Sequence, residues 1–183
     1  MPIQTLNPTT EKVEKTFAED SDELIREKIA RAQGAFELWR NASIEDRSAL
    51  IYKVADLLEE RKDAYAVLIA REMGRPVSAG TGEIVKCAWV CRYYAQHAQS
   101  MLEHEIIMSD AVKSYARFDP LGIVCAVMPW NFPFWQVFRF AAPALMAGNV
   151  GILKHASNVP QCAQAIESIF QDAGCPGGIF QNM

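Results

Sequence analysis

The sequence has no long hydrophobic run and no excess of positive charge. Its longest mainly apolar stretch, residues 140–153, is interrupted by Pro143 and Asn149 and is too short to cross a lipid bilayer. Lysine and arginine number 18 against 22 aspartates and glutamates, which argues against a polybasic nucleic-acid-binding protein. The N-terminus carries neither a basic segment nor an apolar core, so we expect no secretory signal. Together these absences favour a cytoplasmic protein with no membrane and no nucleic-acid partner.

Cysteine, glycine and proline are also sparse. The five cysteines are odd in number and irregularly spaced, so we expect free thiols in a reducing compartment. Cys87 and Cys91 would share one helix face, but no nearby histidine or cysteine completes a metal site, and we expect no metal. Ten glycines and nine prolines are too few for a low-complexity chain. The chain of 183 residues is therefore expected to be an ordered globular protein.

Residues 20–102 are dominated by helical periodicity. Asp20 and Glu23 have the spacing of a capping box, and Ser43, followed three residues later by Asp46, marks a second helix start. Apolar residues then recur at three- and four-residue steps up to Gly74, which is a typical helix stop. This region is therefore predicted to be mainly helical.

Two further features follow in the chain. Residues 83–102 are typical of a long helix, and we expect its aromatic side chains, Trp89, Tyr93 and Tyr94, to pack inward. Residues 103–108 and 113–119 are typical of extended segments joined by a turn. The sequence therefore predicts a β-hairpin that protrudes after the helical region.

Residues 122–183 alternate strands and helices. Residues 122–128 and 150–153 are apolar throughout, which is typical of parallel strands buried on both faces. Helices are predicted over 134–147 and from Pro160 to about residue 173, and a third strand begins at residue 179. The predicted fold class is α/β, with a partial Rossmann-like parallel sheet. Because so short an outer strand is a poor place for a domain to stop, we expect the front part of a larger protein.

In a parallel α/β sheet, ligands gather at the carboxyl ends of the strands. The first strand is followed by the loop Met128-Pro-Trp-Asn-Phe-Pro133, which its two prolines stiffen. Asn131 in this loop could aim its side-chain amide at a fixed point, as a donor to an oxyanion must. The alternative is that Asn131 caps the helix that begins near Phe134, with Trp130 in the core.

The second strand end carries Lys154 and Ser157. Lys154 directly follows a buried strand, so its charge either meets an anionic or hydroxyl-rich ligand or reaches out to solvent. Ser157 either joins such a site or caps the next helix. Arg139 is a third candidate, because a cation on an apolar helix usually pairs with a carboxylate from the protein or from a ligand. The three histidines show no metal-ligand spacing and are expected to be satisfied or surface residues.

A set of short motifs runs through the chain in order. They are Asn7-Pro-Thr-Thr10, Asp119-Pro-Leu-Gly122, Met128-Pro-Trp-Asn-Phe-Pro133, Pro143-Ala-Leu145, Ala147-Gly-Asn149, Leu153-Lys154, Pro160 and Gly174-x-Pro176-x-Gly178. This set resembles the aldehyde dehydrogenase superfamily over essentially the whole chain, and most resembles its bacterial succinate-semialdehyde dehydrogenases. The resemblance implies the NAD(P)-dependent oxidation of an aldehyde, in particular succinate semialdehyde, to the carboxylic acid.

The resemblance implies roles for two residues toward the substrate. Asn131 matches the family's asparagine that helps to bind the oxyanion of the thiohemiacetal formed from the aldehyde. Arg139 falls where members specific for succinate semialdehyde place an arginine for the distal carboxylate. The implied partner is therefore a small-molecule aldehyde.

The resemblance also implies a cofactor site. Pro129 and Trp130 fall on positions that line the cofactor cleft, and Lys154 falls on the lysine that contacts the adenosine ribose. Members that prefer NAD often have glutamate three residues after this lysine, where this sequence has Ser157. The implied cofactor is therefore NADP or NAD. His155 replaces the proline commonly found after the lysine.

Family members are more than twice as long, and their nucleophilic cysteine, general-base glutamate and glycine-containing turn lie beyond the positions matched here. Residues 1–183 are therefore expected to be the N-terminal portion of the cofactor-binding domain, with 103–119 as an oligomerisation hairpin and the catalytic domain absent. We expect a homo-oligomer in the full-length form, and an inactive enzyme when this chain is alone. The alternative is a catalytically inactive truncated module that binds nucleotide or a partner subunit.

Overall fold

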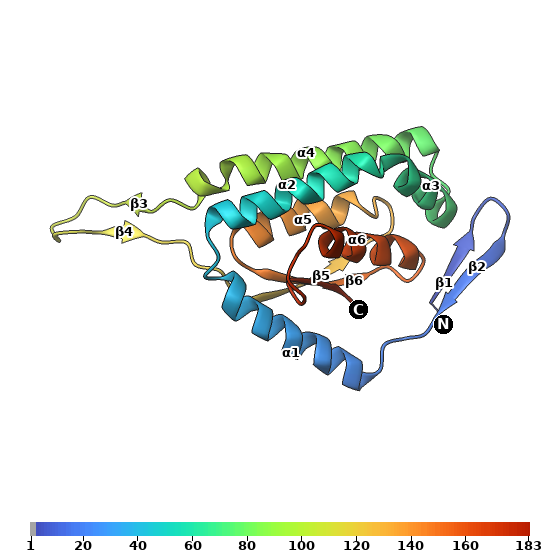
Figure 1. The fold of residues 1–183 in the computed structure, drawn as a ribbon, viewed down its shortest axis with the longest axis horizontal. Helices are drawn as coiled ribbons and strands as arrows, with labels where there is room; N and C mark the ends of the chain where they lie inside the picture. The colour runs from blue at the N-terminus through green and yellow to red at the C-terminus, as the bar shows by residue number, and fades with distance from the viewer. Residues whose placement is uncertain (1–2) are drawn as a thin grey trace.

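The computed structural model describes residues 3–183, and Figure 1 shows their arrangement. A helical N-terminal region leads into a region where parallel strands alternate with helices. None of the helices in the described residues combines the length and the apolar character that crossing a bilayer requires. In chain order the elements are β1 (Ile3–Asn7), β2 (Lys12–Phe17), α1 (Asp22–Trp39), α2 (Ile44–Glu60), α3 (Lys62–Met73), α4 (Val77–Met101), β3 (Glu105–Ile106), β4 (Tyr115–Ala116), β5 (Ile123–Met128), α5 (Trp135–Met146), β6 (Val150–His155), α6 (Pro160–Asp172) and β7 (Phe180–Asn182).

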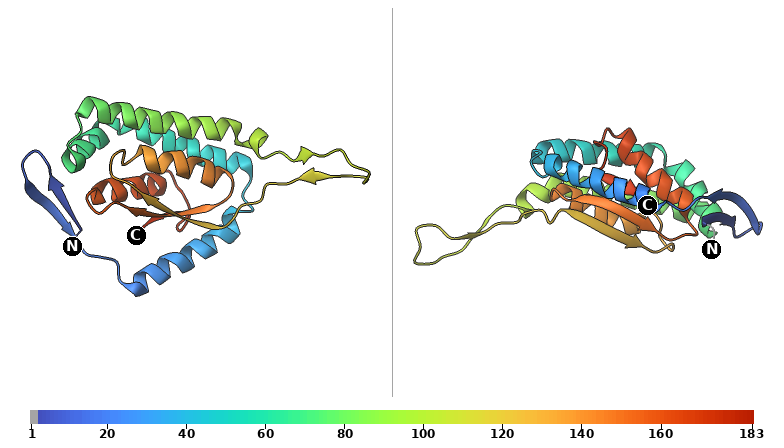
Figure 2. Two further views of the ribbon diagram at one scale, coloured as in Figure 1. Left: turned by 180° about the vertical axis from the view of Figure 1, so that it is seen from behind. Right: turned by 90° about the horizontal axis from the view of Figure 1, so that it is seen from below.

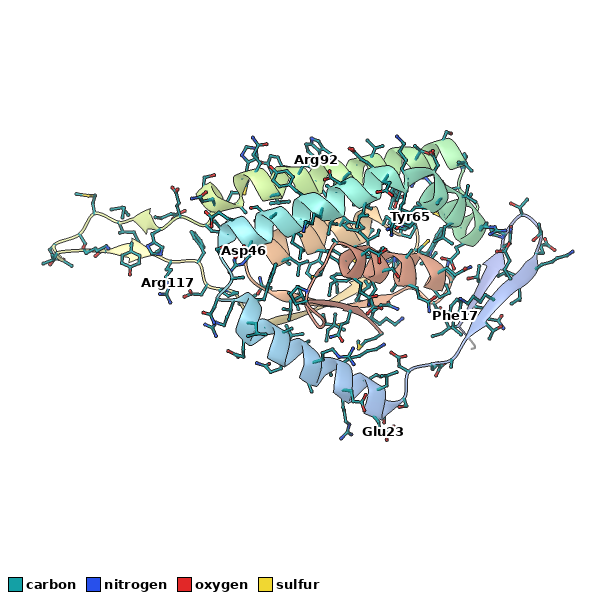
Figure 3. All side chains as sticks on the ribbon, viewed as in Figure 1. Phe17, Glu23, Asp46, Tyr65, Arg92 and Arg117 are labelled. Carbon is teal, nitrogen blue, oxygen red and sulfur yellow. The ribbon has the colours of Figure 1, made fainter. Side chains whose placement is uncertain are left out.

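The elements form layers around the parallel sheet (Figures 1 and 2). α1 packs on one face of the sheet, and α5 and α6 pack on the other. α2, α3 and α4 form an outer helical layer against α5 and α6. Within this outer layer, Arg92 of α4 bonds Asp56 and Glu59 of α2 on the molecular surface, where Figure 3 labels it. One continuous hydrophobic core joins the layers, and Phe134 and Phe138 are among its fully buried side chains.

β5, β6 and β7 form a parallel sheet in that order, which confirms the predicted α/β fold. β6 is buried along most of its length, as predicted. β5 is not buried on both faces, and this part of the prediction is wrong. Cys125 is exposed and Val127 is 74% exposed, whereas Ala126 between them is buried. Cys125 and Val127 lie on the face of the sheet opposite α5. They are exposed because α1, the helix on that face, packs mainly over β6 and leaves this part of β5 uncovered.

Most predicted helix boundaries hold because a local residue sets them. Ser21, rather than Asp20, caps α1, and its hydroxyl accepts the N–H three residues on at 3.2 Å. Ser43 caps α2 in the same way at 3.0 Å. Gly74 ends α3 in the left-handed conformation, at a φ of 73° that favours glycine. The continuous apolar pattern between these caps is divided at Arg61 into two helices, α2 and α3.

The aromatic residues of α4 do not all pack inward, and that prediction is wrong. Trp89 is 59% exposed and Tyr93 is 38% exposed, and their rings stack with centroids 5.8 Å apart on the surface. Tyr94 is half-buried. Small side chains make up most of the inward face instead, so α2 and α5 can pack closely against α4. The buried small residues of α4 are Gly80, Cys87, Ala88, Cys91, Ala95 and Ala98.

Two antiparallel hairpins lie outside the parallel sheet. β1 pairs with β2, and β1 packs on α3 and α6. β3 pairs with β4 through Glu105–Ala116 and Ile106–Tyr115, and this hairpin projects from the body of the molecule (Figure 1). The predicted protruding hairpin is therefore confirmed. Its part in oligomerisation stays a prediction.

Candidate functional site

The two predicted strand ends lie side by side. β5 and β6 are parallel neighbours, with Met128 opposite His155. The loop of residues 129–134 and the loop of residues 156–159 therefore leave the same edge of the sheet, where ligands bind in such folds. Most of the predicted site residues are on these two loops.

His155 connects the two loops through hydrogen bonds. Its ring is buried, and its Nδ1 accepts the N–H of Ala156 at 2.8 Å. Because Nδ1 accepts, the ring proton is on Nε2, which donates to the carbonyl oxygen of Pro133 at 2.9 Å. Burial lowers the pKa of His155, although the bond to Pro133 acts in the opposite direction, so the neutral form is favoured. The expectation of a satisfied histidine is confirmed here.

A carboxylate, and not Asn131, caps α5. The buried Glu83 of α4 accepts the N–H groups of Phe134 and Trp135 through Oε1, at 2.9 and 3.0 Å. Its Oε2 accepts from Arg75 at 2.7 Å. Burial raises the pKa of Glu83, although the helix N–H groups and Arg75 act in the opposite direction. The capping alternative for Asn131 is therefore wrong, and its amide is left for another partner.

α6 is capped in the same way by Glu72 of α3. The buried carboxylate accepts the N–H of Gln161 through Oε1 at 2.9 Å and that of Cys162 through Oε2 at 2.8 Å. Oε1 also accepts the hydroxyl of Thr5. The capping alternative for Ser157 is therefore wrong. Because the protein's own carboxylates occupy the positive ends of α5 and α6, neither helix N-terminus is open to a phosphate group.

Asn131 is exposed and lines a cavity of about 380 Å³ between α4 and the start of α5. We call this cavity the Asn131 pocket. Its walls include Gly82, Glu83 and Lys86 of α4 together with Phe132 and Trp135. The guanidinium of Arg75 lies 4.0 Å from the centre of the Phe132 ring. An amide donor and two cations around one cavity suit a ligand that carries or develops negative charge.

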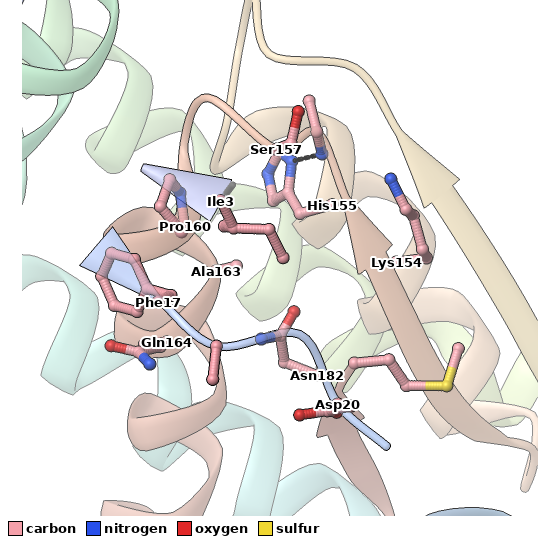
Figure 4. Close-up of a pocket in the computed structure, with 13 residues that line it drawn as sticks. Ile3, Phe17, Asp20, Lys154, His155, Ser157, Pro160, Ala163, Gln164 and Asn182 are labelled. Carbon is pink, nitrogen blue, oxygen red and sulfur yellow. Dashed lines mark hydrogen bonds between the residues drawn. The ribbon is translucent and has the colours of Figure 1, made fainter. Parts of the chain in front are cut away.

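Lys154 and Ser157 line a second cavity, of about 240 Å³, which we call the Lys154 pocket (Figure 4). Its opposite wall includes Asp20 and Asn182. Asp20 is paired with Lys28, whereas Lys154 makes no ion pair within residues 3–183. The pocket therefore offers an ammonium and a hydroxyl that is no helix cap, which are suitable donors to ribose oxygens or a phosphate.

Pro129, Trp130 and Arg139 line neither pocket. Pro129 is exposed and Trp130 is 50% exposed, so the alternative that Trp130 belongs to the core is wrong. Arg139 is exposed and pairs with no carboxylate in the described part of the chain. It follows Trp135 by four residues on α5, so it lies beside the Asn131 pocket on the same helix face.

Four of the five cysteines are in unsuitable surroundings for a nucleophile. Burial raises the pKa values of Cys87, Cys91 and Cys162, and it raises that of Cys175 to about 12. These thiols are therefore protonated at neutral pH and unreactive. Cys125 is exposed on β5, and all five are free. Within residues 3–183, no group of three or more metal-ligating side chains comes close enough to hold a metal ion.

Inspection of the sequence missed the residues that shape these pockets. Glu83 binds backbone groups 51 and 52 residues away, and Glu72 binds groups 89 and 90 residues away. Lys86 reaches the ring of Trp135 from a different helix. No local pattern marks such partners, because the tertiary packing of α3 and α4 creates them. His155, the last residue of β6, was noted in the sequence as the replacement of a family proline, and its bond to the other loop was not predicted.

The chain is similar to known sequences over its whole length. The aldehyde dehydrogenase family profile matches residues 1–183. The chain is 51% identical over its whole length to a probable succinate-semialdehyde dehydrogenase (NADP+) of Synechocystis sp., of which it covers 40%. It is 47% identical to succinate-semialdehyde dehydrogenase (NADP+) 1 of Mycobacterium tuberculosis, with all of this chain and 41% of that protein covered.

A solved structure of similar sequence has the same fold over the length of this chain. The succinic semialdehyde dehydrogenase of Streptococcus pyogenes, in complex with NADP+, matches with a TM-score of 0.96 and 34% identity. The match covers 99% of this chain and 40% of that one. This chain thus spans about 40% of the length of the relatives it matches. Since the family profile covers the whole of residues 1–183, the chain belongs to the aldehyde dehydrogenase family.

Proposed function

We propose that these residues are the cofactor-binding and oxyanion-binding part of an enzyme that oxidises succinate semialdehyde to the dicarboxylic acid with NADP or NAD. The observation that carries the proposal is the placement of Asn131, whose amide caps no helix and lines a pocket bordered by cations. The test is aldehyde-dependent formation of reduced cofactor by the complete enzyme. Absence of turnover with succinate semialdehyde and with uncharged aldehydes would refute the proposal.

The chemistry divides between these residues and the rest of the enzyme. Attack of a thiolate on the aldehyde turns the carbonyl oxygen into an oxyanion, and the Asn131 amide donates a hydrogen bond to it. Four of the five cysteines have a raised pKa and are not suited to supply that thiolate, and Cys125 on β5 does not line the Asn131 pocket, so we place the nucleophile outside residues 1–183. When bound, the nicotinamide cofactor supplies the hydride acceptor. This chain alone is therefore expected not to oxidise aldehydes.

Two observations support a cofactor site at the Lys154 pocket. Lys154 has no carboxylate partner in residues 3–183, and Ser157 makes no capping bond. At about 240 Å³ the pocket is smaller than a typical cavity for a whole ligand, so we assign it to the adenosine ribose alone. The exposed Pro129 and Trp130 leave the same sheet edge and would contact the rest of the dinucleotide. Because Glu72 and Glu83 occupy the two helix N-termini, we place the pyrophosphate elsewhere.

Ser157→Glu should shift the cofactor preference of the complete enzyme toward NAD. A glutamate at this position would accept from the ribose 2′-hydroxyl and repel a 2′-phosphate that Lys154 otherwise attracts. We expect the ratio of kcat/KM for NADP to that for NAD to fall about tenfold, which is about 1.4 kcal/mol. The control is Asn158→Asp, which adds the same charge one residue on. If the two variants have the same ratio as the parent, Ser157 does not face the ribose.

Arg139→Ala should impair succinate semialdehyde more than an uncharged aldehyde. The Arg139 guanidinium is exposed and has no carboxylate partner within residues 3–183, so a substrate carboxylate can take that place. We expect the ratio of kcat/KM for succinate semialdehyde to that for butanal to fall about tenfold, a loss typical of a charged hydrogen bond. Arg26→Ala on α1, across the sheet, is the matched control. Equal losses with both aldehydes would indicate a structural role for Arg139.

The protruding hairpin supports a homo-oligomer of the complete enzyme. Met108 is 91% exposed and Ile106 is 70% exposed, which is unfavourable unless another protein surface covers them. We assign that surface to a second copy of the same enzyme. The five free cysteines support a reducing location, the cytoplasm.

A further inference from the structure

Lys86 of α4 stands at the wall of the Asn131 pocket. Its Nζ lies 3.9 Å from the centre of the Trp135 ring of α5, and both residues line the cavity. A cation over the face of an indole is held there by the ring's quadrupole. The side chain is nonetheless exposed, so its ammonium also faces solvent at the opening of the pocket.

The other charges around this pocket are already neutralised. Arg75 bonds Glu83 at 2.7 Å, and the second oxygen of Glu83 accepts two backbone N–H groups at the start of α5. Lys86 has no carboxylate within 4.0 Å in the described part of the chain. It is therefore the uncompensated charge among the residues that line the Asn131 pocket.

A second uncompensated cation stands close by. Arg139 follows Trp135 by one helical turn on α5, and residues so spaced have Cβ atoms about 5–6 Å apart. Lys86 thus contacts Trp135 from α4, and Arg139 follows Trp135 on the same face of α5. Two cations without carboxylate partners in residues 3–183, one at the wall of the Asn131 pocket and one beside it, together with an amide donor suit a molecule that is anionic at one end and has a polarised oxygen at the other.

We propose that Lys86 is a specificity residue that binds the carboxylate end of an anionic aldehyde at the opening of the Asn131 pocket. It acts together with Arg139, while Asn131 receives the aldehyde oxygen. The inference rests on the proposed function and adds a residue that selects for the semialdehydes of dicarboxylic acids over uncharged aldehydes. Lys86 attracts the substrate electrostatically, so added salt weakens its effect.

The kinetic test uses Lys86→Gln in the complete enzyme. We expect the ratio of kcat/KM for succinate semialdehyde to that for butanal to fall about fivefold, in the range of a partly exposed ion pair. Lys86→Arg should retain most of the ratio, because it keeps the charge. The matched control is Lys53→Gln, which removes the same charge from an exposed position on α2 and should leave the ratio unchanged. A ratio in Lys86→Gln equal to that of Lys53→Gln would overturn the inference.

A binding test separates this inference from the proposed function, because it needs no turnover. Succinate is titrated into the parent enzyme and each variant, and its Kd is measured by calorimetry at low and at physiological salt. We expect Kd to rise about fivefold in Lys86→Gln at low salt and less at higher salt. If no aldehyde is oxidised but this shift appears, the proposed function fails and the anion site stands. If aldehydes are oxidised but Kd is the same in Lys86→Gln and Lys53→Gln, the anion site fails and the function stands.

Discussion

Replacing Asn131 with alanine in the complete enzyme should lower kcat about 10²–10³-fold, a loss of about 2.7–4 kcal/mol of transition-state stabilisation. The amide caps no helix, since Glu83 holds the N–H groups of Phe134 and Trp135, so its removal leaves the start of α5 intact. Under the proposed function, its hydrogen bond to the substrate strengthens only when the carbonyl oxygen becomes an oxyanion. The loss should therefore appear in kcat, while the affinity for NADP changes less than threefold or so. Steady-state kinetics with succinate semialdehyde and NADP measures both quantities.

The control for this result is Asn158→Ala. Asn158 is exposed on the neighbouring loop and lines neither pocket, so its removal tests for a general effect of losing a loop amide. Asn158→Ala should retain the parent kcat. If Asn131→Ala raises KM for the aldehyde but leaves kcat unchanged, Asn131 binds the substrate before the reaction and does not stabilise the oxyanion.

The parts of the fold that could be predicted from sequence are those with local causes. Ser43 and Gly74 set helix ends through their own hydroxyl and left-handed backbone, so the neighbouring residues suffice to identify them. The two apolar runs that became β5 and β6 predicted the parallel pair correctly. The inward packing of Trp89 was wrong, because helical periodicity identifies a face but not the side on which the helix has neighbours. Val127 is exposed for a related reason, because no sequence pattern reports how far α1 covers the sheet.

In the candidate site too, features with a local cause could be predicted and features that depend on distant contacts could not. The sequence identified Asn131, Lys154 and Ser157 because loops after parallel strands meet at one edge of a sheet. It left open whether Asn131 and Ser157 were helix caps. That question depended on two glutamates of the outer helical layer, which come from elsewhere in the chain. The caps from Glu72 and Glu83 leave the loop side chains available for ligands. The outer helical layer therefore determines which loop side chains are available to a ligand, even at positions where it would contact no ligand itself.

Glu72 should be the most sensitive of these positions for stability. Its carboxylate is 3% exposed and accepts the backbone N–H groups of Gln161 and Cys162 and the hydroxyl of Thr5. Glu72→Ala would leave those donors buried without an acceptor, at about 1–3 kcal/mol each, and would remove the negative charge from the positive end of α6. We expect the free energy of unfolding to fall by about 3–5 kcal/mol, a large part of the stability of an ordinary domain. Urea denaturation of this chain, followed by circular dichroism, measures the change.

A conservative variant and a control variant show whether the loss in Glu72→Ala comes from the carboxylate. Glu72→Gln keeps one carbonyl oxygen for Gln161 but turns an amide N–H toward the N–H of Cys162, so it should lose about half as much free energy as Glu72→Ala. Glu27→Ala removes an exposed glutamate from α1 and should change the stability by less than about 0.5 kcal/mol. If Glu72→Ala and Glu27→Ala unfold at the same urea concentration, the N–H groups of α6 must find other acceptors. The carboxylate would then not hold the N-terminus of α6, and the account of why Ser157 is available to a cofactor would fail with it.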